Sequence, residues 1–169
     1  MDIIINICYI FMLKIKPYKQ SAYYLCGPAS LKMILSYYGV DKSEKIIAKQ
    51  TSTTSKIGCA HQNLIKYAKK LGFKAYFKDN FSIKNLESLI NKKIPVIIDW
   101  FSLKGEGHYS VIIGITDNKI IYIDPYDGKI MKIHKQDFLF RWFDFIGFPS
   151  KKSLVLRRVI VVYKEYKQL

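Results

Sequence analysis

Cys26 has the setting that a nucleophilic thiol needs. It stands directly before Gly27 and Pro28, at the start of a segment over residues 26–38 whose apolar residues recur at helical spacing. The N-terminus of a helix carries partial positive charge and free backbone N–H groups, which favour a thiolate over a thiol. The other cysteines, Cys8 and Cys59, lack this setting, and we expect both to be buried, reduced thiols.

A nucleophilic cysteine needs a base, and the chain has three histidines. His108 begins an apolar segment directly after the sequence Gly-Glu-Gly, which predicts the end of a strand facing a cleft. A buried structural histidine is the alternative at this position. His61 begins a predicted helix and His134 ends a predicted strand, so we expect both of them to be solvated.

A third group must orient the base, and Asp124 is our candidate. It ends the predicted strand 119–124, which a turn at residues 117–118 joins to the strand of His108. His108 lies about nine residues before that turn and Asp124 about six after it, so both fall towards one end of the sheet. A bulge or an offset must absorb the difference. A turn cap is the alternative for Asp124, and Asp99 and Asp127 are weaker candidates.

Gln20 lies six residues before Cys26. Acyl transfer needs hydrogen-bond donors for the oxyanion of the tetrahedral intermediate. The side-chain amide of Gln20 and the backbone N–H of Cys26 are the two donors that we expect.

Around these residues, the spacing of apolar side chains changes along the chain from a helical period to the alternation of strands. We expect further helices at residues 43–49, 60–71 and 82–91, with Ser43 and Ser82 as caps, and a short one at 136–143. We expect strands at residues 73–78, 94–101, 107–116, 119–124, 129–134 and 154–163. Helices followed by mostly antiparallel strands predict an α+β fold, with the helices packed on one face of the sheet, and one domain over residues 1–169.

Composition limits the partners of this domain. The chain has 169 residues, of which 50% are hydrophobic, and this excludes a disordered chain. The net charge of +15 is typical of nucleic-acid binding, but 25 of the 28 basic residues are lysines spread along the chain. We therefore expect no nucleic-acid partner and keep a basic nucleic-acid or membrane-surface protein as a third hypothesis. No Cys/His cluster indicates a metal, and we expect no cofactor.

The N-terminal run at residues 3–13 is apolar except for Asn6. It is too short to cross a bilayer, which takes about 20 apolar residues, and it lacks the basic flank of a secretory signal. Two interpretations remain for residues 1–11: a buried first strand, or an extension from an over-extended reading frame, with Met12 as the start. We expect a cytoplasmic protein with no membrane span.

Three motifs occur in a fixed order: Gln20-x5-Cys26-Gly-Pro-Ala-Ser, then Gly-His108-Tyr-Ser-Val, then Asp124-Pro. Over about residues 17–145 this pattern resembles the C39 peptidase family, a papain-like group that includes the double-glycine leader peptidases of bacteriocin exporters. The resemblance implies a papain-like cysteine peptidase fold. It makes Cys26 the nucleophile, His108 the general base and acid, Asp124 the residue that orients the imidazole, and Gln20 part of the oxyanion hole.

The chain departs from the leader peptidases at Leu25, where they usually carry an acidic residue. It also has no membrane spans and no nucleotide-binding loop, so we expect a free-standing C39-like domain that acts on a peptide or protein substrate, with a separate peptide exporter as a further partner. Cleavage after a Gly-Gly leader is the substrate class that the resemblance suggests. The alternative is a catalytically silent peptide-binding module of the same fold.

Overall fold

The computed structural model describes residues 11–104, 106–146 and 153–165. Most of the apolar N-terminal run lies outside the described residues. From residue 11 onwards the chain joins the sheet, because Met12 pairs with Gly114 and the backbone N–H of Leu13 donates to the carbonyl of Ile113 at 2.8 Å. In the described parts of the chain no helix is long and apolar enough to cross a bilayer.

Within the described residues, five helices form where the local signals predict them: α1 (Cys26–Tyr37), α2 (Glu44–Gln50), α3 (His61–Lys70), α4 (Ile83–Asn91) and α5 (Lys135–Arg141). The predicted caps of α2 and α4 are confirmed, since the Ser43 side chain accepts from the backbone N–H of Ile46 and the Ser82 side chain accepts from that of Asn85. Gly39 follows α1 with φ of 78°, a conformation that favours glycine.

The main sheet has six strands in the order β1-β8-β2-β3-β4-β5. They are β1 (Lys74–Lys78), β2 (Val96–Phe101), β3 (Gly107–Ile115), β4 (Lys119–Asp124), β5 (Lys129–His134) and β8 (Arg158–Tyr163). All neighbouring strands are antiparallel. A separate two-stranded sheet contains β6 (Phe143–Ile146) and β7 (Ser153–Leu156).

The C-terminal part of the prediction needs two corrections. The expected helix at residues 136–143 ends at Arg141, and Phe143 begins β6 instead. The expected strand at residues 154–163 is two strands in different sheets, broken at Arg157, whose φ is 52°. The two strands differ in burial: only Val155 of β7 is buried, whereas β8 is buried almost throughout and belongs to the centre of the sheet.

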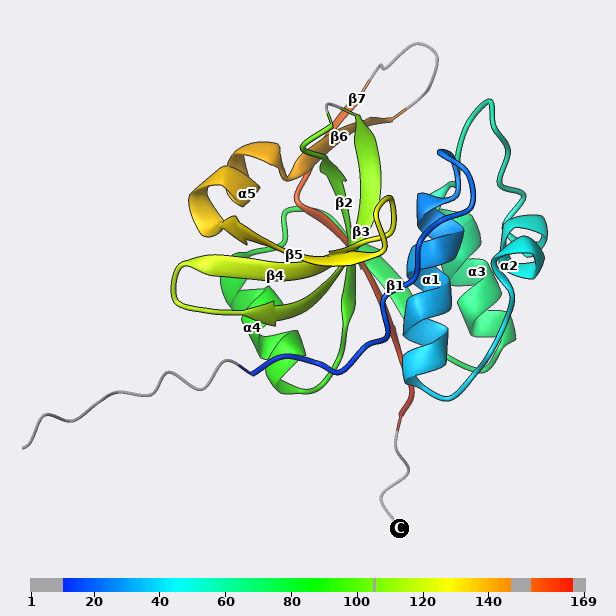
Figure 1. The fold of residues 1–169 in the computed structure, drawn as a ribbon, viewed down its shortest axis with the longest axis horizontal. Helices are drawn as coiled ribbons and strands as arrows, with labels where there is room; N and C mark the ends of the chain where they lie inside the picture. Colours follow the sequence, from blue (N-terminus) through cyan, green and yellow to red (C-terminus); the bar gives the residue numbers. More distant parts are fainter. Residues whose placement is uncertain (1–10, 105, 147–152, 166–169) are drawn as a thin grey trace, which may run out of the picture.

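The central strands β2, β3 and β8 are buried along nearly their whole length, so both of their faces are covered. Figure 1 shows α1, α2 and α3 to one side of these strands and α4 and α5 to the other. The expectation that all helices share one face was therefore wrong, whereas the α+β class with N-terminal helices on an antiparallel sheet is confirmed. This packing brings the start of α1 close to the start of β3.

Candidate active site

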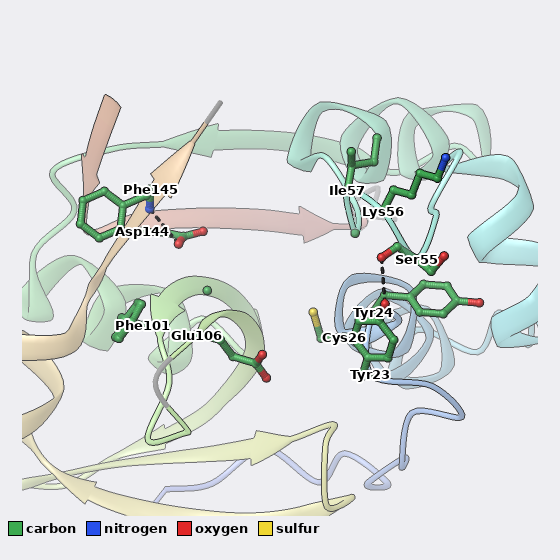
Figure 2. Close-up of a pocket in the computed structure, with 12 residues that line it drawn as sticks. Tyr23, Tyr24, Cys26, Ser55, Lys56, Ile57, Phe101, Glu106, Asp144 and Phe145 are labelled. Carbon is green, nitrogen blue, oxygen red and sulfur yellow. Dashed lines mark hydrogen bonds between the residues drawn. The ribbon is translucent and has the colours of Figure 1, made fainter. Parts of the chain in front are cut away.

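Cys26 is the first residue of α1 and lines a cavity of about 450 Å³. Leu25 occupies the N-cap position and its side chain makes no cap hydrogen bond, so that side chain does not compete for the backbone N–H groups of Cys26 and Gly27. Figure 2 shows the sulfur pointing into the space between two walls of the cavity. Cys26 therefore lies at a helix N-terminus, as predicted, and its role as the nucleophile stays a prediction.

His108 and Asp124 meet as the hairpin predicts. The distance between His108 Nε2 and Asp124 Oδ1 is 2.8 Å, and the two side chains are almost completely buried. The register between β3 and β4 shifts between Ile112 and Gly114, which is the irregularity that the counting along the hairpin required. The backbone N–H of Tyr126 also donates to Asp124 Oδ1 at 2.9 Å. The carboxylate is thus held from two sides and can orient the imidazole.

The electrostatics of this pair favour a charged imidazolium. Burial by itself would lower the pKa of His108, but hydrogen bonds to Asp124 and Cys26, together with the charges of both, raise it to about 10. Burial likewise opposes ionisation of Asp124, yet the hydrogen bond and charge of His108 bring the pKa of Asp124 below its ordinary 3.8. Because Nε2 is bound to Asp124, the other ring nitrogen, Nδ1, is the one available to Cys26.

Gln20 is buried between the active-site turn and α1. Its backbone N–H donates to the carbonyl of Pro125, the residue after Asp124, at 2.7 Å. Its side-chain Nε2 donates to the carbonyls of Ala22 at 2.8 Å and Tyr23 at 2.9 Å, and Oε1 is buried with no hydrogen-bond partner. Both amide hydrogens are thus taken by backbone carbonyls, so an oxyanion would have to displace one of these acceptors. The role of Gln20 in the oxyanion hole stays a prediction.

The remaining cysteines and histidines separate into buried and exposed groups. Cys59 is buried as expected, and burial raises the pKa of its thiol to about 11, so it stays protonated at neutral pH. Cys8 lies outside the described residues. His134 is exposed as expected, but the expectation that His61 is solvated was wrong. His61 is buried, and Arg158 donates to its Nδ1 at 3.1 Å.

Sequence reasoning missed the carboxyl pair Asp99 and Asp144. Asp99 on β2 is 3% exposed and hydrogen-bonds to Asp144 on β6, which lines the cavity of Cys26. Burial, and then the charge of Asp144, hold the pKa of Asp99 well above its usual range. The only available signal was a charged residue inside the apolar strand sequence 96–101, and nothing in the sequence paired it with residue 144. In the described parts of the chain no cluster of three or more His, Cys, Asp or Glu side chains is placed to hold a metal ion.

Solved structures of two peptidase domains share this fold. The peptidase domain of Streptococcus ComA, from a bifunctional ABC transporter, matches with a TM-score of 0.71 at 22% identity over 89% of this chain and 98% of that chain. A double glycine motif protease from an AMS/PCAT transporter, solved in complex with the leader peptide, also has a TM-score of 0.71, at 20% identity over 91% of this chain and 94% of that chain.

Two curated proteins are similar in sequence. The sublancin-168-processing and transport ATP-binding protein SunT of Bacillus subtilis (strain 168) is 34% identical over 142 residues, which are 80% of this chain and 19% of that protein. The pediocin PA-1 transport/processing ATP-binding protein PedD of Pediococcus acidilactici is 32% identical over 120 residues, or 69% of this chain and 16% of that protein. The chain thus spans less than a fifth of either relative. The model of the Peptidase C39 like family matches residues 12–146, and the chain accordingly belongs to this family of cysteine peptidases.

Proposed function

We propose that this chain is a cysteine peptidase that hydrolyses a peptide bond through a covalent thioester on Cys26. One observation carries the proposal: His108 hydrogen-bonds Asp124 through one ring nitrogen and interacts with Cys26 at the N-terminus of α1. A nucleophile, a base and a group that orients the base are the three parts that this chemistry needs.

The reaction follows from the roles of these groups. The proton of the Cys26 thiol resides on His108 Nδ1, and the thiolate attacks the scissile carbonyl carbon to form a C–S bond. The backbone N–H of Cys26 donates to the oxyanion. When the C–N bond breaks, the imidazolium gives its proton to the leaving nitrogen. A water molecule, deprotonated by His108, then attacks the thioester and releases the thiolate. Asp124 orients the ring in both steps and stabilises its charged form whenever His108 holds the proton.

Gln20 supplies the second oxyanion donor in this proposal by exchanging one of its two backbone acceptors for the oxyanion. The bond between its backbone N–H and Pro125 ties it to the turn that holds Asp124, so the donor and the orienting carboxylate keep a constant separation. This exchange predicts that Gln20→Ala lowers kcat and leaves KM nearly unchanged, because the new bond forms only with the tetrahedral intermediate. Steady-state kinetics of the two proteins on one peptide measure this split.

The substrate that we propose is a peptide cut after a Gly-Gly pair. Support comes from the names of the similar proteins: two are processing and transport proteins, of sublancin-168 and of pediocin PA-1, and one solved relative is a double glycine motif protease in complex with the leader peptide. By the same reasoning a separate peptide exporter would handle the product. Co-purification of the chain with an exporter from its own cells would test that partner.

The test of the activity uses short peptides that contain one Gly-Gly pair, with products read by mass spectrometry. We expect cleavage by the wild-type chain, none by Cys26→Ala, and a loss of about 10²–10⁴-fold for His108→Ala. His134→Ala is the matched control, since this histidine is exposed at the end of β5. Peptides that bind equally well to wild type and Cys26→Ala without any product would instead establish a silent peptide-binding module.

A further inference from the structure

The cavity of Cys26 has two chemically different walls. We call Phe101, Glu106, Gly107, Asp144 and Phe145 the acidic wall. Figure 2 shows the labelled members of this wall on one side of Cys26, and on the other side the aromatic, polar and basic residues Tyr23, Tyr24, Ser55, Lys56 and Ile57. The net charge of the chain is +15, so two carboxylates in one cavity wall run against its overall charge.

The acidic wall lies on the histidine side of the nucleophile. Gly107 belongs to the wall and directly precedes His108 on β3. In thiol acyl transfer the imidazolium must reach the leaving nitrogen to protonate it. The part of the substrate that leaves as an amine therefore passes along the acidic wall, whereas the acyl part stays bound to Cys26.

Asp144 is held in place by its neighbours. The buried carboxyl of Asp99, whose pKa burial holds well above its usual range, hydrogen-bonds to Asp144. The backbone N–H of Phe145 donates to Asp144 Oδ1 at 2.8 Å. The Asp144 carboxyl also packs against the Cα of Gly107, where a side-chain Cβ would lie only 2.8 Å from its Cγ. The position of this carboxylate relative to the strand of His108 is thus set by packing.

The two carboxylates of the wall are those of Glu106 and Asp144. In the parts of the chain that the structure describes, no lysine or arginine forms an ion pair with Glu106 or Asp144. Glu106 is exposed at the mouth of the cavity, and Asp144 is half-buried in its wall. A half-buried, unpaired carboxylate attracts a cation more strongly than one in open water, because the solvent screens it less.

We propose that Asp144, with Glu106 beside it, selects substrates that carry a lysine or arginine side chain on the amine side of the scissile bond. This inference rests on the proposed peptidase function and deepens it, because it names a specificity-determining residue and the class of substrate that it accepts.

The experiment compares three peptides that differ in one residue after the Gly-Gly pair: lysine, its uncharged analogue norleucine, or glutamate. For the wild-type chain we expect kcat/KM to be about five- to tenfold higher with lysine than with norleucine, which is the range of one partly buried ion pair. Glutamate should be the poorest of the three. The ratio should shrink as NaCl rises from about 50 mM to about 500 mM, because salt screens charges at a cavity mouth.

Asp144→Asn should bring the lysine/norleucine ratio close to one, and Glu106→Gln should reduce it in part. Because Glu106 is exposed, we expect Glu106→Gln to fold even if Asp144→Asn is destabilised by the change at the hydrogen bond to Asp99. Asp41→Asn is the matched control, since its side chain is 90% exposed and follows the opposite end of α1. It should keep the wild-type ratio.

A binding measurement separates this inference from the peptidase proposal. Dissociation constants of the same peptides for Cys26→Ala, with and without Asp144→Asn, report recognition without turnover. A wild-type ratio near one, an unchanged ratio in both carboxylate variants, or equal affinity of Cys26→Ala for the three peptides would overturn the role of Asp144. If the role of Asp144 is overturned but the norleucine peptide is still cleaved, the proposed peptidase activity stands. Tight binding that favours the lysine peptide, without any cleavage, would refute the peptidase activity and support the role of the acidic wall in recognition.

Discussion

Gly27→Ala is the sharpest perturbation that the structure offers, because it pushes apart the two elements that carry Cys26 and His108. A Cβ on Gly27 would lie 2.9 Å from the Cβ of Cys59 and 3.2 Å from the ring of Tyr109. Carbon atoms pack at about 3.5–4.0 Å, so the new methyl group must separate from Cys59 by about 0.6 Å and from Tyr109 by about 0.3 Å. Tyr109 directly follows His108, and Gly27 directly follows Cys26. The added methyl group should therefore change the distance between Cys26 and His108.

The effect on activity should exceed the effect on stability. Overpacking a core costs about 1–3 kcal/mol, and alanine in place of glycine in a helix returns about 1 kcal/mol, so we expect at most about 2 kcal/mol of lost unfolding free energy. A misplacement of about 1 Å between reacting groups costs about 10²-fold in rate, and a shift of about half that size should cost about tenfold. The assays are kcat/KM on a Gly-Gly peptide, the alkylation rate of Cys26 by iodoacetamide, and chemical denaturation.

A second substitution makes this reasoning refutable. Cys59→Gly removes both atoms of Cys59 that crowd the new methyl group. Adding Gly27→Ala to Cys59→Gly should therefore cost much less activity than adding it to the wild-type chain. Ser36→Ala, on the exposed part of the same helix, is the control and should behave as wild type. Wild-type turnover by a folded Gly27→Ala, or a double variant no better than Gly27→Ala, would show that this contact does not set the geometry of the pair.

Three further predictions concern titratable groups. Asp124→Asn removes the anion that holds the His108 imidazolium, so kcat/KM should fall by at least about 100-fold while near-ultraviolet circular dichroism stays native. Wild-type activity should decline as pH rises through about 10, where His108 loses the proton that the leaving amine needs; a decline near pH 7 would contradict the ion pair. Burial, and then the charge of Arg158, lower the pKa of His61 from 6.5 to about 4. The unfolded chain therefore binds this proton first, and unfolding free energy should be fully retained above pH 6.5 and fall between pH 6.5 and about 4. Denaturant titrations of wild type and His61→Asn should show a smaller pH slope in the variant, and equal slopes would refute this assignment.

Local signals in the sequence were sufficient for the positions of the reacting groups. Pro28 near the first turn, helical apolar spacing and Gly39 after the last turn define α1, so the place of Cys26 at its N-terminus follows from neighbouring residues alone. His108 and Asp124 lie on adjacent strands of one hairpin, and counting from its turn brings them together. Interactions between residues close in sequence depend little on the rest of the fold, which is why they can be predicted from the sequence.

Only the tertiary structure decided which side chains surround these groups. The partner of Asp99 lies 45 positions away on β6, a strand that the sequence pattern did not predict, and the break at Arg157 between β7 and β8 leaves no local signature. His61 is buried, and Arg158 reaches it from the last strand of the sheet. These pairings depend on the order of strands and on how helices pack across them, and packing geometry over such separations is set by the whole core rather than by any short segment. The sequence therefore determined the candidate nucleophile and its base, whereas the folded chain determined the walls of the cavity in which they lie.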